Sequence, residues 1–238
     1  MATSDNLKRL ATAFTVRDIM VSTRELVCAT VESDAALVSK SYSDFSFIPI
    51  KSGNGFSAYY SRDSGEVNTI GVPDLISDGT GILDLVDVFA LREFAFVLGP
   101  RQIDGYVHYS DLNHPLVKLT FYVLLEGVER FALDSVKPRL NDEFLKACLG
   151  MPRFDQIQKS YRRAGDAGQS PINYLNIADV LKLALRAGVL EIQESVVEAV
   201  KDVRDGAAHV SEYLVSEYSD VMKLAQVKGE CLRVLRSL

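Results

Sequence analysis

The sequence predicts an α+β protein in two parts: small mixed sheets with helices over residues 1–112, and an all-helical bundle over residues 113–238. Two observations carry this prediction. Up to about residue 112, short runs rich in β-branched and aromatic residues alternate with short amphipathic segments. Beyond that point only the helical spacing of apolar residues recurs, in segments too long for ordinary strands.

Two similar series of elements follow one another in the first part. In the first series we expect strands at 26–31, 45–50 and 55–63 and a helix at 32–43, capped by Ser33 or Asp34. In the second we expect a helix within 76–93 and strands at 94–99 and 104–112. Each series ends on a strand that carries a serine followed by an aspartate, which indicates an internal repeat of about fifty residues.

The second part begins with a long helix expected at 114–133, with Pro115 suitably placed in its first turn. Shorter amphipathic segments follow at 141–149, 154–165, 174–188 and 191–205, with Gly165, Gly168 and Gly188 as stops. A last long helix is expected at 211–238.

Bulk composition excludes several classes of protein. Hydrophobic content of 47% and charged content of 24% are ordinary for a soluble globular chain. A net charge of −6 gives no global attraction to nucleic acid, so we expect no DNA partner, and RNA binding would need a local basic patch. The three cysteines are far apart and predict reduced thiols. Without a signal peptide or an apolar run of membrane-spanning length, we expect a cytoplasmic protein with no membrane partner.

Four stretches of the first part carry a family resemblance: VRDIM at 16–20, FSFIPI at 45–50, YYSRD at 59–63 and HYSDL at 108–112. On these, residues 14–112 resemble a tandem pair of CBS domains, the Bateman module. The resemblance implies that an adenosine-type nucleotide (AMP, ADP, ATP or S-adenosylmethionine) binds as a regulatory ligand in a cleft between the repeats.

The family's strand-end Thr/Ser-x-x-Asp implies the nucleotide-binding residues. Asp63 and Asp111 match its aspartates, which accept hydrogen bonds from the ribose hydroxyls. The sequence departs from the family at the hydroxyl position that meets a phosphate. Tyr60 and His108 stand there, with Ser61 and Ser110 as neighbouring hydroxyls that could replace it. In the ordinary alternative, Asp111 caps the helix that follows and Asp63 begins a turn.

The second part contains VRDGAAH at 203–209, with an arginine five residues before one of only three histidines. On this R-x(4–6)-H pattern, and on Glu126 and Glu129 in the first helix, it resembles a HEPN domain. The resemblance implies a homodimer through the helical part that sets two motifs face to face. It also implies RNA cleavage without a metal or other catalytic cofactor.

The residue types suit that chemistry. His209 would transfer protons during attack by the RNA 2′-hydroxyl, Arg204 would bind the phosphate through its planar fork, and Asp205 would orient either group. Five residues along a continuous helix turn through about 140°, so the two side chains would point apart. We therefore expect Gly206 to interrupt the helix.

Further polar residues lie near the motif or offer it other partners. Glu212 and Tyr213 could line the same cleft as Arg204 and His209. The ordinary alternative is that His209 ends a helix and that Arg204 pairs with Asp202 or Glu198. The run KPRL at 137–140, with Lys146, Arg153, Lys159, Arg162 and Arg163, is expected to form a basic face for RNA or merely a solvated surface. His108 and His114 have no partners in metal-ligand spacing, so no metal site is expected.

Two functions remain open on the sequence alone. In the first, a nucleotide-sensing module controls a metal-independent endoribonuclease that cleaves RNA through attack of the 2′-hydroxyl. In the second, the protein is a non-catalytic, ligand-sensing dimerisation and interaction protein. The two differ in whether His209 performs chemistry.

Overall fold

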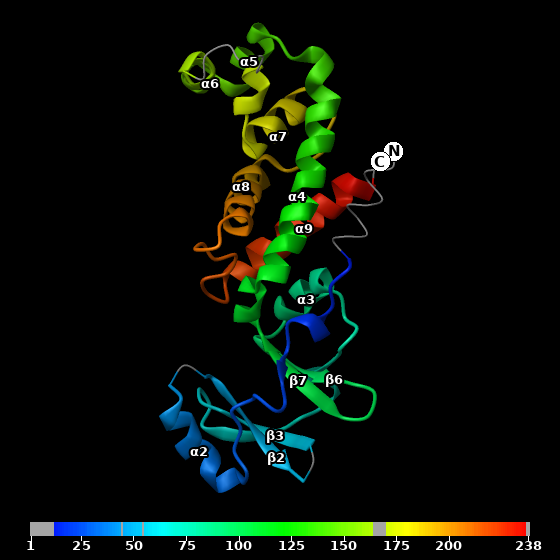
Figure 1. Ribbon diagram of the computed structural model, residues 1–238, viewed down its shortest axis with the longest axis vertical. Coiled ribbons are helices and arrows are strands. Elements are labelled where there is room, and N and C mark those ends of the chain that lie inside the picture. Colours follow the sequence, from blue (N-terminus) through cyan, green and yellow to red (C-terminus); the bar gives the residue numbers. More distant parts are fainter. Residues whose placement is uncertain (1–11, 44, 54, 164–169, 237–238) are drawn as a thin grey trace. The chain divides into compact units, whose positions relative to one another are not determined.

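The computed structural model describes residues 12–43, 45–53, 55–163 and 170–236 (Figure 1). The chain divides into two compact units: a strand unit, Phe14–Asp111, and a helical unit that comprises the rest of the described chain, chiefly from Leu112 onward. The strand unit has two small sheets with helices, one of them mixed, and the described part of the second unit is helical. The predicted α+β class is therefore confirmed at this level.

The strand unit contains two sheets. The four-stranded sheet has the order β1 (Val21–Ser22), β7 (Ile103–His108), β6 (Phe94–Leu98) and β5 (Leu75–Ser77). Its β5–β6 pair is parallel and the other two pairs are antiparallel. The three-stranded sheet is antiparallel, with the order β2 (Phe47–Ser52), β3 (Gly55–Ser61) and β4 (Glu66–Thr69). Helices α2 (Glu32–Ser41) and α3 (Ile82–Phe89) complete the unit.

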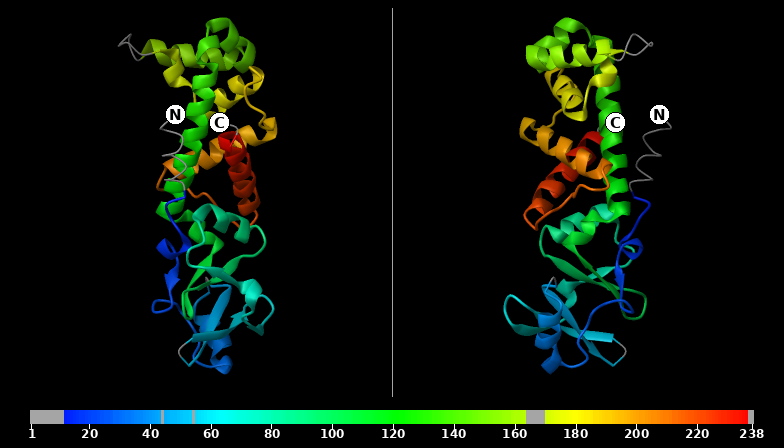
Figure 2. Two further views of the ribbon diagram at one scale, coloured as in Figure 1. Left: turned by 90° about the vertical axis from the view of Figure 1, so that its right-hand side faces the viewer. Right: turned by 60° about the vertical axis from the view of Figure 1, so that its left-hand side comes forward.

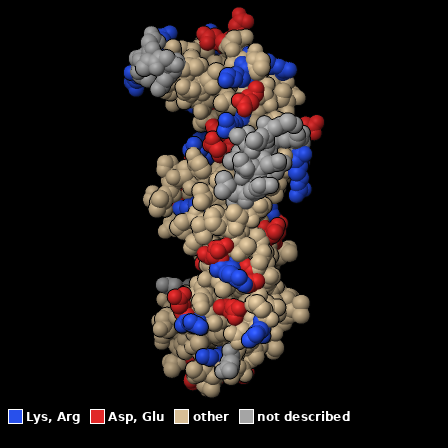
Figure 3. Space-filling model, turned by 45° about the vertical axis from the view of Figure 1, so that its right-hand side comes forward, with Lys and Arg blue, Asp and Glu red and all other residues tan. Residues whose placement is uncertain are grey.

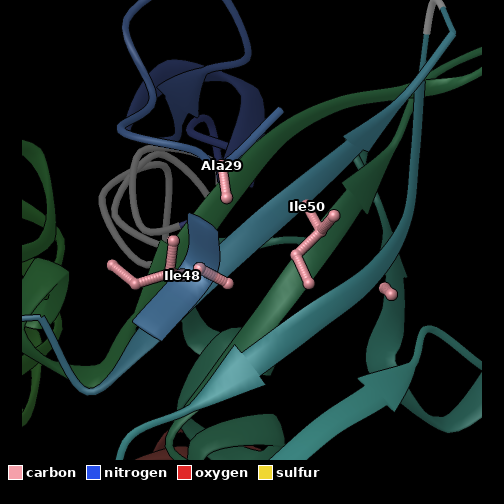
Figure 4. Close-up of a cluster of buried hydrophobic side chains, with 5 residues drawn as sticks. Ala29, Ile48 and Ile50 are labelled. Carbon is pink, nitrogen blue, oxygen red and sulfur yellow. The ribbon is translucent and has the colours of Figure 1, made fainter. Parts of the chain in front are cut away.

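Aromatic side chains join the two sheets of the strand unit. The Phe94 ring of β6 lies with its centroid 4.1 Å from that of Phe47 on β2 and 5.0 Å from that of Tyr59 on β3. Each such pair contributes about 0.5–1.5 kcal/mol beyond the area that it buries. A second cluster lies beneath α2, and Figure 4 labels its Ala29, Ile48 and Ile50.

Helix α4 (Pro115–Val136) is the centre of the helical unit and packs against α7, α8 and α9 (Figure 2). Its buried residues recur three or four positions apart, as a core-facing helix requires: Val117, Phe121, Leu124, Leu125, Val128, Ala132 and Val136. The other described α-helices of the unit are α5 (Asp142–Leu149), α6 (Met151–Arg163), α7 (Ile177–Arg186), α8 (Glu194–Ala208) and α9 (Asp220–Arg236). No described helix is long and apolar enough to cross a membrane.

Several elements differ from the sequence-based prediction: strand β1 was not expected, the strand expected at 104–112 ends at His108, and α2 is capped by Val31, not by Ser33 or Asp34. The strand expected at 26–31 is reduced to one isolated bridge between Ala29 and Ile50. Strand β4 was not expected, because its residues EVNT lack apolar alternation. The last helix begins at Asp220, not at residue 211. The Asp220 carboxylate accepts hydrogen bonds from the backbone N–H groups of Ser216 and Glu217.

Candidate functional site

Helix α8 carries the Arg204–His209 motif and runs without a break through Gly206 to Ala208. The predicted interruption at Gly206 is therefore wrong. The glycine has another role: it is buried, and a Cβ placed there would lie 2.8 Å from the carbonyl oxygen of Tyr213. Its missing side chain lets the chain fold back closely over α8 after the helix has ended.

That returning segment, residues 209–215, is the motif loop, and two polar side chains from the start of the α4 region hold it. The Lys118 ammonium, only 8% exposed, donates to the carbonyl oxygens of His209 and Val210, each at 3.2 Å, and of Glu212. The Asn113 side chain accepts from the N–H groups of Leu214 and Val215 and donates to the Val215 carbonyl at 2.7 Å. The loop is thus an ordered part of the unit.

Arg204 lies on the side of α8 that faces α4. Its guanidinium carbon is 5.7 Å from the centroid of the Tyr122 ring, within the range of a cation–π contact. Burial raises the pKa of Glu129; the charge of Arg204 partly offsets this rise and that of Glu126 adds to it. The carboxylates of Asp202 and Glu198, the alternative partners, instead pair with Lys223 and Lys182 at 2.7 and 2.6 Å.

A cavity of about 440 Å³, the motif cavity, opens beside Arg204. Its walls come from α4, from the end of α8 and from the motif loop: Asn113, Pro115, Lys118, Leu119, Tyr122, Arg204, Ala207, Ala208 and Val210. His209 stands between two of these lining residues and is exposed. Tyr213 lines a different, smaller cavity beside α9, and Glu212 supplies its carbonyl to Lys118, so the expected shared cleft is not formed.

The three motif side chains do not converge within one chain. Asp205 pairs with Lys201 at 3.2 Å, and Arg204 contacts Tyr122. Among the described residues, no side-chain interaction joins either of them to His209. The histidine closes the last turn of α8 through its backbone N–H, which donates to the Asp205 carbonyl at 3.1 Å. An active site with both groups would therefore need a second motif.

In the strand unit, His108, Ser110 and Asp111 form one cluster at the end of β7. The Asp111 carboxylate accepts from the His108 backbone N–H at 2.8 Å, and His108 Nδ1 lies 2.9 Å from the Ser110 hydroxyl. Burial raises the pKa of Asp111 to about 6, and that same backbone hydrogen bond partly offsets the rise. Burial also lowers the pKa of His108 to about 4. Asp111 does not cap α4, whose N-cap is His114.

The residues around Asp63 are placed differently. Asp63 is exposed in the turn between β3 and β4, as the turn alternative expects. Tyr60 packs against the cluster beneath α2, and Ser61 is buried. Arg62, which the sequence did not single out, donates to the Ser39, Tyr42 and Ser43 carbonyl oxygens at the end of α2.

The expected basic face is only partly formed. Arg153 donates to both carboxylate oxygens of Asp179, at 2.6–3.1 Å, and is bound there. Lys146, Lys159, Arg162 and Arg163 line a cavity between α5 and α6, whereas Arg139 of the KPRL run donates to the Ala187 carbonyl. Elsewhere, basic and acidic side chains are interspersed on the face that Figure 3 displays. Within the described ranges, no group of three or more His, Cys, Asp or Glu side chains could hold a metal ion.

No protein-family model matches the chain, and no curated protein matches it. Solved structures do match, among them two of the CBS domain of a bacterial CNNM/CorC family Mg²⁺ transporter. The one in complex with an inhibitor has 15% identity and a TM-score of 0.37 over 48% of this chain and 82% of its own. The one in complex with ATP has 13% identity and a TM-score of 0.38 over 49% of this chain and 95% of its own.

Proposed function

We propose that the protein is a nucleotide-responsive endoribonuclease: the strand unit binds an adenosine-type nucleotide, and the helical unit cleaves RNA without a metal as a homodimer. One observation carries the catalytic half. Lys118, Asn113 and the missing side chain of Gly206 fix the backbone of the loop that starts at the exposed His209, next to two lining residues of a cavity whose wall carries an arginine and a tyrosine. A fixed backbone supports the preorganisation that catalysis at a phosphate requires.

The reaction needs no group from outside the protein. One His209 takes the proton of the 2′-hydroxyl, the 2′-oxygen attacks phosphorus, and the bond to the 5′-oxygen breaks. A protonated His209 from the second chain then gives a proton to that oxygen, while Arg204 binds the phosphate oxygens. The products carry a 2′,3′-cyclic phosphate and a 5′-hydroxyl.

Incubation of the purified protein with total RNA in EDTA tests this scheme. We expect His209→Ala to lose about 10²–10⁴ in rate, and Arg204→Lys to lose activity because lysine lacks the bidentate fork. Ser211→Ala, in the same exposed part of the loop, is the matched control and should retain activity. Full activity in His209→Ala, or products with a 3′-hydroxyl, would refute the mechanism.

The dimer is tested by light scattering at micromolar concentration. Because Arg204 and His209 do not converge in one chain, a monomer that still cleaves RNA would contradict a site composed of two motifs.

For the ligand, we propose that Asp63 and Asp111 accept hydrogen bonds from the ribose, with Ser61, Ser110, Tyr60 and His108 as their neighbours. The Asp111 oxygen Oδ2 holds the His108 N–H, while Oδ1 has no donor among the described residues and could accept a ribose hydroxyl. Calorimetry with AMP, ADP, ATP and S-adenosylmethionine tests this. Binding that survives the double substitution Asp63→Ala and Asp111→Ala would show that these residues are not the ribose partners.

A second candidate is a non-catalytic, ligand-sensing interaction protein. The observation that favours it is that Arg204 packs on Tyr122 and Asp205 pairs with Lys201, so that both have structural partners within the chain. It predicts no RNA cleavage by any preparation, together with an intact dimer and intact nucleotide binding.

A further inference from the structure

The basic groove is a cavity of about 590 Å³ between α5 and α6. It is lined by Asp142, Lys146, Phe154, Asp155, Gln158, Lys159, Arg162 and Arg163. It lies outside the motif cavity and shares no lining residue with it.

The spacing of its residues places two of the cations in a row on one helix. Lys159 and Arg162 are three positions apart on α6, so they share one face of that helix, about 4.5 Å apart along its axis. Lys146 comes from α5, and its ammonium lies 4.7 Å from the centroid of the Phe154 ring. This cation–π contact keeps the lysine beside the row.

The groove cations differ in their partners from three lysines elsewhere in the helical unit. Lys182, Lys201 and Lys223 each lie 2.6–3.2 Å from a carboxylate oxygen. No ion pair within the described part of the chain includes Lys146, Lys159, Arg162 or Arg163. With four cations against two carboxylates, the groove is a local excess of positive charge in a chain of net charge −6.

We propose that the basic groove binds the phosphate backbone of single-stranded RNA. The two α6 cations are about 4.5 Å apart along the helix axis, close to the spacing of about 3.4 Å between phosphates along one stacked strand, so they suit two neighbouring phosphates. Arginine forks suit phosphate oxygens, and the concave floor suits a strand better than a flat anionic membrane. The inference rests on the proposed function in one respect, since it takes RNA as the ligand of the helical unit.

The position of the groove indicates what it contributes. Helices α5 and α6 follow the C-terminal end of α4, whereas the motif cavity lies beside Lys118 and Tyr122 near its start (Figure 1). From Tyr122 to the end of α4 is about 20 Å. Contacts made that far from the reacting phosphate bind ground state and transition state alike, so losing them raises KM and leaves kcat unchanged.

Fluorescence anisotropy with a labelled twelve-nucleotide RNA tests the groove, in a His209→Ala background so that the probe is not cut. Lys159→Gln with Arg162→Gln should weaken binding about tenfold at 50 mM salt and make the salt slope shallower by about 1.4, or 0.7 for each lost phosphate contact. The matched control is Lys182→Gln with Lys223→Gln, which removes the same charge from paired lysines and should bind as the parent does.

Equal weakening in the control pair would overturn the proposal, because it would mean that only net charge matters. Tighter binding of anionic vesicles or of a DNA strand of equal length would overturn the choice of RNA. The two proposals fail separately. If RNA binding depends on the groove but the wild type does not cleave RNA, only the proposed nuclease activity is refuted. If the protein cleaves RNA with a KM that the groove substitutions leave unchanged, only the proposed role of the groove is refuted.

Discussion

Replacing Lys118 by methionine should release the motif loop while leaving the helices intact. The change keeps the length and apolar stem of the side chain but removes an ammonium that holds three carbonyl oxygens. A hydrogen bond to a charged group contributes about 1.5–3 kcal/mol, so the three together contribute about 4.5–9 kcal/mol. Burying the ammonium costs several kcal/mol, which offsets much of this gain.

The net loss is reduced further because the carbonyls belong to exposed residues that can bind water once the loop opens. We therefore expect Lys118→Met to lower the free energy of unfolding by about 2–3 kcal/mol, which corresponds to a fall in Tm of about 4–12 °C. Locally, hydrogen exchange at the Leu214 and Val215 amides, which donate to Asn113, should become faster.

Urea unfolding measures the global loss and amide exchange the local one. The control is Lys223→Met, because Lys223 pairs with Asp202 at the surface, where such a pair contributes about 0–1 kcal/mol. A Lys118→Met protein with the Tm of that control and unchanged exchange in the loop would refute the reasoning.

The remaining predictions concern pH and two packing contacts. Folding raises the pKa of Asp111 from 3.8 to about 6 and lowers that of His108 from 6.5 to about 4. Between these values the folded chain binds a proton at Asp111 that the unfolded chain lacks, and lacks a proton at His108 that the unfolded chain binds. These effects nearly cancel in the wild type. Relative to it, acidification from about pH 6 to about pH 4.5 should destabilise Asp111→Asn by about 1.4 kcal/mol per pH unit and stabilise His108→Asn by as much. Urea unfolding at several pH values checks both signs, and parallel slopes in the two variants would contradict the cluster. Gly206→Ala should destabilise by about 1–3 kcal/mol through its clash with the returning loop, whereas Gly229→Ala, in open space on α9, should stabilise by up to about 1 kcal/mol. Thermal unfolding that ranks the two glycines the other way would exclude the clash. Arg153→Met should cost about 2–3 kcal/mol, because it leaves the buried carboxylate of Asp179 without its charged partner; an unchanged Tm would mean that the pair contributes nothing.

The periodicity of apolar residues was sufficient to predict the elements that bury an apolar face of their own side chains. Helix α3 buries Ile82, Leu85, Val86 and Phe89, the spacing from which the sequence predicts it. Strand β4 has no such face, since all four of its residues are polar or exposed, and it forms because its backbone pairs with β3. A pattern of side chains carries no signal for that pairing.

The start of α9 was mispredicted for a different reason. Leu214 and Val215 are buried and continue a helical pattern, yet Asn113 binds their backbone N–H groups from about one hundred positions earlier in the chain. The role of Gly206 has the same origin. A glycine in a helix suggests a break when read locally, and only the path of the motif loop shows that it admits a carbonyl group.

For the candidate site, residue types were easier to predict than partners. The motif itself stands out in the sequence because the chain has so few histidines. That Arg204 packs on Tyr122, and that Arg153 leaves the basic face for Asp179, depends on which helices pack together. Only the Asn176–Asp179 capping box, with its characteristic spacing, could have indicated a buried carboxylate at the start of α7.

The hydrogen bonds from Lys118 to the motif loop also determine when the motif can form during protein synthesis. The residues that it binds lie 91–94 positions further along the chain. At about 5–20 residues per second, a ribosome adds that stretch in about 5–20 s. During this interval α4 exists but the loop that presents His209 does not. A chain still being made therefore has no completed motif until residues 209–215 have been added, and whatever activity the motif confers begins only after that point.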